Sequence, residues 1–261
     1  MIDIHAHILP GFDDGAKSIE ASLEMARGAE REGVADVVAT PHVLEENQPD
    51  VREKICGAVA DLNTVLNKER INVKVSPGAE VHISASLLSR AEILKDLSLN
   101  FGGRYVLLEL PLQEVPKFTE ELIFRVLLKR LTPILAHPER NLTIIENPGR
   151  LLGLVEKGAL VQMNVGSITG RYGRRIKETA ELFLHNGIVH FVASDAHSEE
   201  NRPIRLRPAI ERVKKLLGDA AADLVLDNAT AALNGEKVEA SVPRHLERPS
   251  KTMFSWLVRR I

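Results

Sequence analysis

Short apolar runs alternate with longer segments of helical periodicity along the chain. The short runs are rich in β-branched residues, which is typical of buried strands, and the longer segments repeat apolar residues every three or four positions. The apolar runs predict strands at Ile2–His7, Val34–Thr40, Val73–Ser76, Tyr105–Leu110, Pro133–His137, Leu160–Val165 and Ile188–Ser194. The helical spacing predicts helices at Ile19–Arg31, Asp50–Lys68, Thr119–Lys129, Pro148–Lys157, Arg175–Asn186 and Pro208–Leu217.

The alternation of strands and helices predicts an α/β protein with a parallel sheet covered by helices. The length of 261 residues suits one α/β barrel better than two small domains, although counting strands does not separate seven from eight. We expect one barrel domain over residues 1–235. Ser18 is a suitable N-cap for the helix at Ile19–Arg31, and Gly33 is a suitable stop signal after it.

The remaining segment, residues 236–261, is predicted to be a basic C-terminal tail. From Ser241 onward it carries five basic residues and one acid, a local charge of +4. Met253–Ile261 is predicted to form a short amphipathic helix, and we favour packing on the barrel over a membrane-surface contact.

Composition narrows the class of protein. With 34 basic and 36 acidic residues the net charge is −2, which argues against a general nucleic-acid binder. The single cysteine, Cys56, excludes an internal disulfide and a thiolate-rich zinc site, and it is predicted to be a core residue of a helix. No apolar run has the length of a membrane span, and the first residues lack the layout of a signal peptide, so a cytoplasmic location is expected.

Potential metal ligands follow nearly every predicted strand, where the catalytic groups of β/α barrels gather. A lone His-x-His pair or a lone glutamate would carry little weight, but five of the nine histidines share this position. Residues two apart in a strand point to the same side, so each His-x-His or Asp-x-His pair can reach one ion. The candidate ligands are His5, His7, Asp14, His42, Glu80, Glu109, His137, Asp195 and His197.

Nitrogen and oxygen donors without thiolate suit manganese, iron, zinc or magnesium. Their number exceeds what one catalytic zinc takes from a protein, so two or three ions are implied. The other histidines (His82, His185, His190 and His245) have no such placement, and we interpret them as ordinary. Competing chemistries lack their motifs: there is no phosphate-binding loop and no Gly-x-Ser-x-Gly elbow, and Leu62 stands where a thiol phosphatase needs arginine six residues after Cys56.

These motifs resemble the PHP (polymerase and histidinol phosphatase) superfamily of trinuclear metallohydrolases. The opening residues 1–15, with Ala39–His42, Leu107–Pro111 and His137–Arg140, resemble more narrowly the bacterial manganese-dependent tyrosine phosphatases of capsule and exopolysaccharide synthesis. The resemblance runs from residue 1 to about residue 230. Asp14 and Glu109 stand where many PHP relatives have histidine, and these carboxylates point to the tyrosine-phosphatase branch.

The resemblance implies a distorted seven-stranded (β/α)7 barrel, similar to a TIM barrel, that holds three ions. By motif, His5, His7, Glu80 and Asp195 would hold one ion, while Glu80, Glu109 and His137 would hold another with Glu80 as the bridge. Asp14, His42 and His197 would hold the third. Manganese is the expected metal, with iron, zinc or magnesium as alternatives.

For the reaction we expect a metal-activated hydroxide that attacks phosphorus in line, without a phospho-enzyme intermediate. Arg140 and Arg202 are the candidate catalytic donors to the developing charge, and the alternative for Arg140 is an ion pair with Glu139 or another surface acid. Asn164 and Ser167 are candidates to line the pocket.

The expected function is a protein-tyrosine phosphatase that acts on an autophosphorylating tyrosine kinase of polysaccharide export, a partner that rests on the resemblance. A small-molecule phosphoesterase such as histidinol phosphatase is one alternative, and an inactive metal-stabilised scaffold is another. The loop after His42, Val43–Asn47, is acidic and shorter than the family pattern, which bears on substrate preference.

Overall fold

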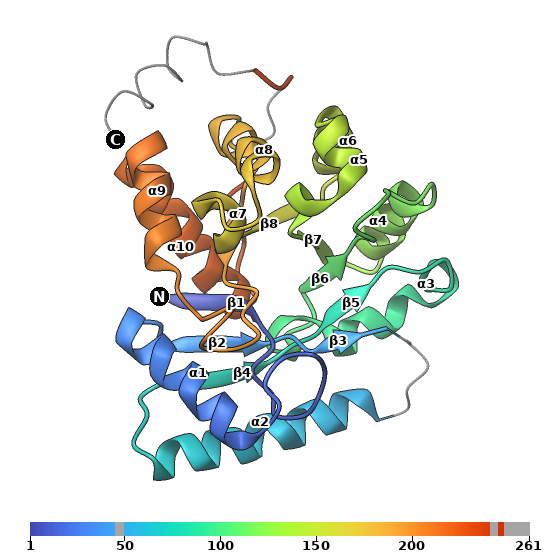
Figure 1. Ribbon diagram of the computed structural model, residues 1–261. Helices are drawn as coiled ribbons and strands as arrows, with labels where there is room; N and C mark the ends of the chain where they lie inside the picture. The colour runs from blue at the N-terminus through green and yellow to red at the C-terminus, as the bar shows by residue number, and fades with distance from the viewer. Residues whose placement is uncertain (45–49, 241–244, 248–261) are drawn as a thin grey trace.

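The computed structural model describes residues 1–44, 50–240 and 245–247, and Figure 1 shows the course of the chain. Its strands are β1 (Ile2–Ala6), β2 (Asp36–Ala39), β3 (His42–Val43), β4 (Lys74–Pro77), β5 (Glu80–His82), β6 (Tyr105–Glu109), β7 (Thr132–Ala136), β8 (Leu160–Asn164) and β9 (Phe191–Ala193). Its α-helices are α1 (Ile19–Glu32), α2 (Val51–Lys68), α3 (Leu87–Arg90), α4 (Thr119–Leu128), α5 (Leu142–Glu146), α6 (Gly149–Glu156), α7 (Val165–Thr169), α8 (Arg174–His185), α9 (Arg207–Leu217) and α10 (Asp219–Leu233). Short 3₁₀ turns lie at Ala91–Leu97, Leu99–Phe101 and Pro138–Arg140.

The paired strands run parallel, in one sheet of order β1-β2-β4 and another of order β3-β5-β6-β7-β8-β9. The chain passes from β2 to β3 across Thr40 and Pro41, and from β4 to β5 across Gly78 and Ala79. Two neighbouring strands thus leave the first sheet and continue in the second. The predicted α/β class with parallel strands is confirmed, whereas among the described residues the strands form two sheets without a closed ladder.

β1 and β9 are end strands of the two sheets, and among the described residues no continuous ladder of hydrogen bonds joins them. We call this junction between β1 and β9 the seam. One isolated bridge joins Ala6 to Ala196. The His7 amide donates to the Ala196 carbonyl at 2.8 Å, and the Asp195 amide donates to the His5 carbonyl at 2.9 Å. The two strand ends that carry the first and last predicted ligand pairs therefore meet at this seam through very few backbone contacts.

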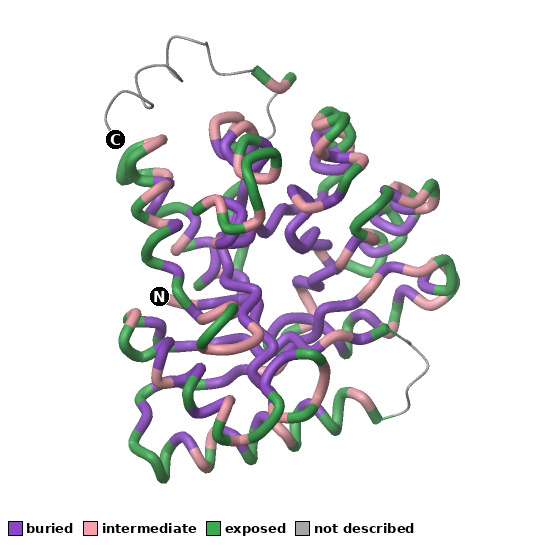
Figure 2. Tube along the Cα trace, viewed as in Figure 1, coloured by how far each residue is buried: buried purple, intermediate pink, exposed green. Residues whose placement is uncertain are grey.

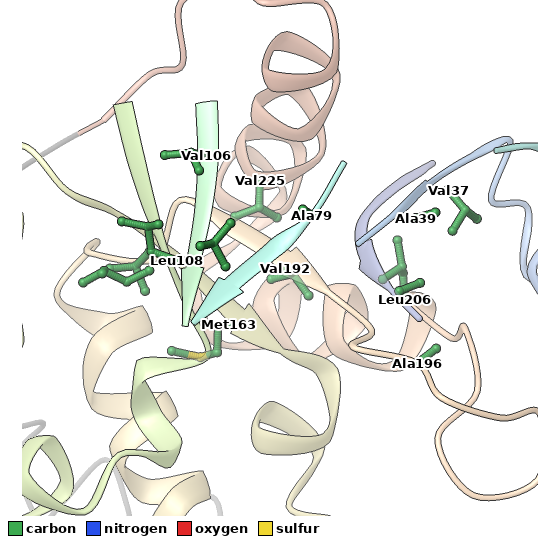
Figure 3. Packing of buried hydrophobic residues seen from close by; sticks show 14 of the residues in the cluster. Val37, Ala39, Ala79, Val106, Leu108, Met163, Val192, Ala196, Leu206 and Val225 are labelled. Atoms are coloured by element: carbon green, nitrogen blue, oxygen red, sulfur yellow. The ribbon is translucent and has the colours of Figure 1, made fainter. Parts of the chain in front are cut away.

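The strands are buried on both faces, with helices set around them (Figures 1 and 2). Alternate residues point to opposite faces of a strand. Leu107 and Ile134 join an apolar cluster with Leu233 of α10, whereas Val106 and Leu108 join a larger cluster with residues of α4 and α6. Figure 3 shows part of the larger cluster around Val106 and Leu108. Because both faces of the strands are apolar, the strand sequences are nearly continuous hydrophobic runs.

The end signals of α1 are as predicted. The Ser18 side chain accepts a hydrogen bond from the Ala21 amide, and Gly33 ends the helix with φ of 77°, a left-handed conformation that glycine adopts without steric cost. The other helices predicted between residues 50 and 217 are also present, with ends within about two residues of those expected. None of the described helices has both the length and the apolar composition that a bilayer crossing requires.

Several features differ from the expectations, and Cys56 and α10 are two of them. Cys56 lies in a helix, but it is exposed, so its assignment to the core was wrong. Ile55 and Val59 take the inward face of α2, and the next position along a helix turns about 100° away from that face. Helix α10 was not predicted, because its many alanines give little contrast between an apolar and a polar side; it packs against β1 and β9.

The predicted tail helix at Met253–Ile261 and residues 45–47 of the acidic loop lie outside the described residues. The first residues after the proposed boundary at 235 contact the barrel: the Glu236 carbonyl accepts a hydrogen bond from the Tyr105 hydroxyl at 2.6 Å. The side chain of Asn186, the residue after α8, donates a hydrogen bond to the Glu247 carbonyl and accepts one from the Glu247 amide. The division at 235 remains a prediction.

Candidate metal centre

The nine predicted ligands come from the carboxyl ends of the strands and from the loops that follow them, and their side chains converge. Register explains part of this convergence, since His42 of β3 pairs directly with Glu80 of β5. Because the strands are parallel, their carboxyl ends meet at one edge. The sequence supplies the rest through polar residues that follow each apolar run.

Glu80 is the centre of the cluster and is fully buried. Its Oε2 atom lies 3.2 Å from His5 Nε2, 3.3 Å from His7 Nε2 and 3.0 Å from His42 Nδ1. Its Oε1 atom lies 3.1 Å from His137 Nε2. One carboxylate thus faces four imidazoles that come from the ends of three strands, β1, β3 and β7, the arrangement expected of a bridging ligand.

Two further groups of donors adjoin Glu80. Asp14 Oδ1 lies 3.3 Å from His197 Nε2 and 3.5 Å from His42 Nε2, and His7 belongs to the same group. Glu109 lies 3.8 Å from both His42 Nδ1 and His137 Nε2. Sets of three or four donors therefore lie within 4.8 Å of one another at more than one position, a spacing that several ions could share.

The backbone turns sharply at two of the ligands. His137 has φ of 32° and Asp195 has φ of 53°, both in the left-handed region that residues other than glycine seldom occupy. His137 directly follows the buried strand β7, and Asp195 comes two residues after the buried strand β9. Each turn directs the side chain into the cluster. Such strained positions cost about 1–3 kcal/mol each and are found mainly at functional sites.

The donor chemistry fits divalent cations. His42 Nδ1 and Glu80 Oε2 are buried without a hydrogen-bond partner in the described chain, and the Nε2 atoms of His5 and His7 lie only 3.3 Å apart. Burial alone would lower the pKa of His5 and raise the pKa of Glu80. The opposite charges outweigh burial, so the pKa of His5 is raised and the pKa of Glu80 is held well below its ordinary value. The field of the cluster thus favours positive charge.

A buried chain of amides holds two of the ligands. His5 Nδ1 lies 3.0 Å from Gln162 Oε1, Gln162 Nε2 donates to Asn164 Oδ1 at 2.9 Å, and Asn164 Nδ2 donates to Asp195 Oδ2 at 2.6 Å. An amide oxygen only accepts, so the proton of His5 lies on Nδ1 and the lone pair of Nε2 faces the cluster. Asn164 was expected to line the pocket, but its side chain instead orients Asp195 through this hydrogen bond.

Asp13 serves His7 in the same way. Its Oδ2 atom lies 2.7 Å from His7 Nδ1 and accepts the His42 amide at 2.9 Å. Burial would raise the pKa of Asp13, but the hydrogen bond and charge of His7 outweigh it and lower the pKa. Sequence reasoning missed Asp13, since two adjacent aspartates give no signal as to which one faces the ligands.

Both candidate arginines contact Asp195. Arg140 Nη1 lies 3.0 Å from Asp195 Oδ2, and the Arg202 guanidinium forms an ion pair with the same oxygen. The Arg140 guanidinium also lies over the Tyr172 ring, 4.8 Å from its centre. The alternative for Arg140 was an ion pair with Glu139 or another surface acid, but the acid it contacts, Asp195, is buried. Glu139 is fully buried and accepts from Ser167 Oγ and the Asn164 amide instead.

Of the histidines interpreted as ordinary, His82 lies at the edge of the cluster. Its Nδ1 atom is 3.4 Å from Glu109 Oε2, because His82 and Glu109 are direct partners in the β5–β6 ladder. His190 is buried away from the cluster, where its Nδ1 accepts the Val161 amide. Burial lowers the pKa of His190 to about 4, so it is a neutral structural residue.

The fold and this cluster define a metal-site α/β protein, and the chain belongs to the CpsB/CapC family of capsular polysaccharide synthesis, whose model matches residues 1–234. The tyrosine-protein phosphatase YwqE of Bacillus subtilis is 38% identical over 252 residues, which cover 95% of this chain and 97% of that protein. The tyrosine-protein phosphatase CpsB of Streptococcus pneumoniae is 29% identical over 234 residues, or 87% and 96% of the two chains. The expected family is thereby confirmed.

Solved structures agree with this assignment. A crystal structure from a description of YwqE of Bacillus subtilis and CpsB of Streptococcus pneumoniae as metal-dependent tyrosine phosphatases superposes on this chain with a TM-score of 0.89. It is 37% identical and covers 95% of this chain and 100% of its own. A histidinol phosphate phosphatase from Lactococcus lactis superposes with a TM-score of 0.53 at 14% identity over 84% of this chain and 95% of its own, a likeness of fold alone.

Proposed function

We propose that this chain is a metal-dependent protein-tyrosine phosphatase. The observation that carries the proposal is the convergence of nine side chains with nitrogen and oxygen donors, the buried Glu80 at their centre, with two arginines on the adjacent Asp195. The family and the names of its relatives support phosphotyrosine as the substrate.

In this proposal two or three divalent ions occupy the cluster. His5, His7, Glu80 and Asp195 hold one ion, and Glu80, Glu109 and His137 hold another. The remaining ligands, Asp14, His42 and His197, hold the third. We propose manganese as the metal, because histidine mixed with carboxylate and without thiolate suits it; iron, zinc and magnesium are the alternatives that metal analysis must separate.

Bound divalent ions supply Lewis acidity toward water and the phosphoryl oxygens. Arg140 and Arg202 supply guanidinium donors to the charge that grows on the phosphoryl group as water attacks the phosphorus and the bond to the tyrosyl oxygen breaks. The leaving phenolate has a pKa of about 10, so the demand for a general acid is modest. The products are tyrosine and inorganic phosphate.

We further propose that the substrate in the cell is an autophosphorylating tyrosine kinase of polysaccharide export and that the reaction takes place in the cytoplasm. The family's role in capsular polysaccharide synthesis supports this partner. The partner is open to direct test by mixing the phosphorylated kinase with this chain and following its phosphotyrosine.

The test compares phosphate release from a phosphotyrosine peptide, a phosphoserine peptide and histidinol phosphate, all with one manganese-loaded preparation. We expect the phosphotyrosine peptide to be preferred and all turnover to stop with chelator and return with added manganese. Preference for histidinol phosphate would instead identify a small-molecule phosphoesterase. No turnover of any substrate by a fully metal-loaded protein would identify an inactive scaffold.

A further inference from the structure

A pocket of about 240 Å³ lies beside the metal centre, between α7 and the segment that joins β9 to α9. Three arginines, Arg171, Arg202 and Arg205, line it, and no acidic residue is among its described lining. Tyr172, Pro203 and Pro208 supply the apolar part of its wall. The nine ligands take no part in this pocket, so it is a separate feature at the same edge of the sheet.

The arginines of the pocket have unused hydrogen-bonding capacity. Within the described chain Arg171 is exposed and has no ion pair, and Arg202 Nε is buried without a partner. Arg205 has one long contact, 3.8 Å from Glu199 Oε1, but that oxygen is already bonded by Arg31 at 2.7 Å. Arg171 and Arg205 thus bring donors and positive charge that the described residues leave largely unused, which favours an anionic ligand.

The pocket and the metal centre share walls. Arg202 lines the pocket and forms its ion pair with Asp195, and Tyr172 lines the pocket and lies under the Arg140 guanidinium. Gly166 makes the position of Tyr172 possible, because a Cβ atom there would lie 2.6 Å from the ring. A substrate held at the metal centre thus has this pocket within reach of the residues next to its phosphorylated side chain.

We infer that this pocket, defined by Arg171, Arg205 and Tyr172, binds an acidic side chain that flanks the phosphotyrosine of a peptide substrate. Its carboxylate would pair with Arg171 and Arg205, and its methylene groups would pack against Tyr172 and Pro203. The mixture of apolar wall and guanidinium donors fits an acidic amino-acid side chain better than a free ion, which has no apolar part. The inference rests on the proposed phosphatase function and adds a preference within it.

The experiment measures kcat and KM for two phosphotyrosine peptides that differ only in glutamate or glutamine at the flanking positions. p-Nitrophenyl phosphate serves as a third substrate that has no flanking residues. The variants are the double change Arg171→Gln with Arg205→Gln and, as the matched control, Arg175→Gln. Arg175 is an exposed arginine of α8 that does not line the pocket.

We expect the unaltered chain to prefer the glutamate peptide by about 10-fold in kcat/KM, because a carboxylate forms charge-assisted hydrogen bonds with the guanidinium groups and the neutral glutamine amide does not. The double variant should lose this preference through a higher KM for the glutamate peptide, with kcat and the turnover of p-nitrophenyl phosphate changed less than about threefold. Arg175→Gln should retain the preference.

Three results would overturn the inference: no preference in the unaltered chain, a preference that survives the double variant, or an equal loss in Arg175→Gln. The last result would mean general electrostatic attraction rather than a pocket. Failure of the proposed function is distinct, because metal-loaded protein would then fail to hydrolyse either phosphotyrosine peptide.

Discussion

Asp13 Oδ2 lies 2.7 Å from His7 Nδ1, while Nε2 of the same ring faces Glu80. The carboxylate fixes the proton on Nδ1 and leaves Nε2 free to bind a cation, as outer partners of metal-bound histidines do. The two adjacent aspartates of this loop therefore have different places: Asp13 behind His7, and Asp14 among the ligands.

Asp13→Asn should weaken manganese binding by about 10–100-fold, because the orienting charge behind His7 is lost while the ligands remain. Activity should recover at high manganese concentration. Asp14→Asn removes a proposed ligand and should stay impaired at any manganese concentration. A manganese titration of the activity of both variants checks this, and identical behaviour of the two would contradict the division of roles.

Glu80→Gln should remove at least one ion and lower kcat by about 10²-fold or more, because one fully buried carboxylate faces four imidazoles. Metal content by atomic spectroscopy and turnover are measured on the same sample. Glu53→Gln, an exposed position on α2, is the control and should retain both. Full metal content with full activity in Glu80→Gln would reject the multinuclear site.

Arg140→Ala should leave the metal content unchanged and lower kcat by about 10²-fold, the usual loss when one donor to a transition state is removed. Arg150→Ala, an exposed arginine of α6, serves as the control for lost surface charge. Steady-state kinetics with a phosphotyrosine peptide give the measurement. A loss below threefold would reject a catalytic role for Arg140, and a loss of metal would reassign it to the support of Asp195.

His190 should make stability depend on pH. Burial lowers its pKa to about 4 from an unfolded value of 6.5, so between these values the unfolded chain binds more protons and stability falls as the pH falls. From pH 7 to pH 5 the contribution of His190 should amount to about 2 kcal/mol lost.

His190→Asn keeps an acceptor for the Val161 amide and cannot titrate, so its unfolding free energy should depend less on pH by that amount. Urea unfolding of both chains in chelator at pH 5 and pH 7 gives the comparison. Chelator keeps metal release out of the result, and His185→Asn is the control histidine. Equal slopes for His190→Asn and the unaltered chain would mean that His190 is not buried as a neutral ring.

Much of the fold followed from the period of the apolar residues. The strands and helices predicted between residues 1 and 217 are present because long apolar runs and clear helical spacing are reliable signals. The short strands β3 and β5 were missed, because two or three residues that include ligands carry no apolar pattern. Helix α10 was missed because its sequence gives little contrast between an apolar and a polar side. The exposed Cys56 shows that membership of a helix alone does not decide which side a residue faces.

The candidate ligands could be found because polar residues at strand ends stand out against apolar runs. The residues that contact or orient these ligands could not be found in this way. Gln162 lies inside a buried strand, and its contact with His5 joins residues far apart in the sequence. His82 needed the strand register to bring it to Glu109, and the pocket of Arg171 and Arg205 needed the path of the chain after β9.

The seam between β1 and β9 gives the metal a second consequence. His5 and His7 lie on one side of it and Asp195 and His197 on the other, with little backbone pairing between them. Ions shared by these side chains would hold the β1 and β9 edges together. The metal would then stabilise the fold in addition to its role in the reaction. Chelation should then raise amide hydrogen exchange first at His7 and Asp195, before the rest of the molecule loosens.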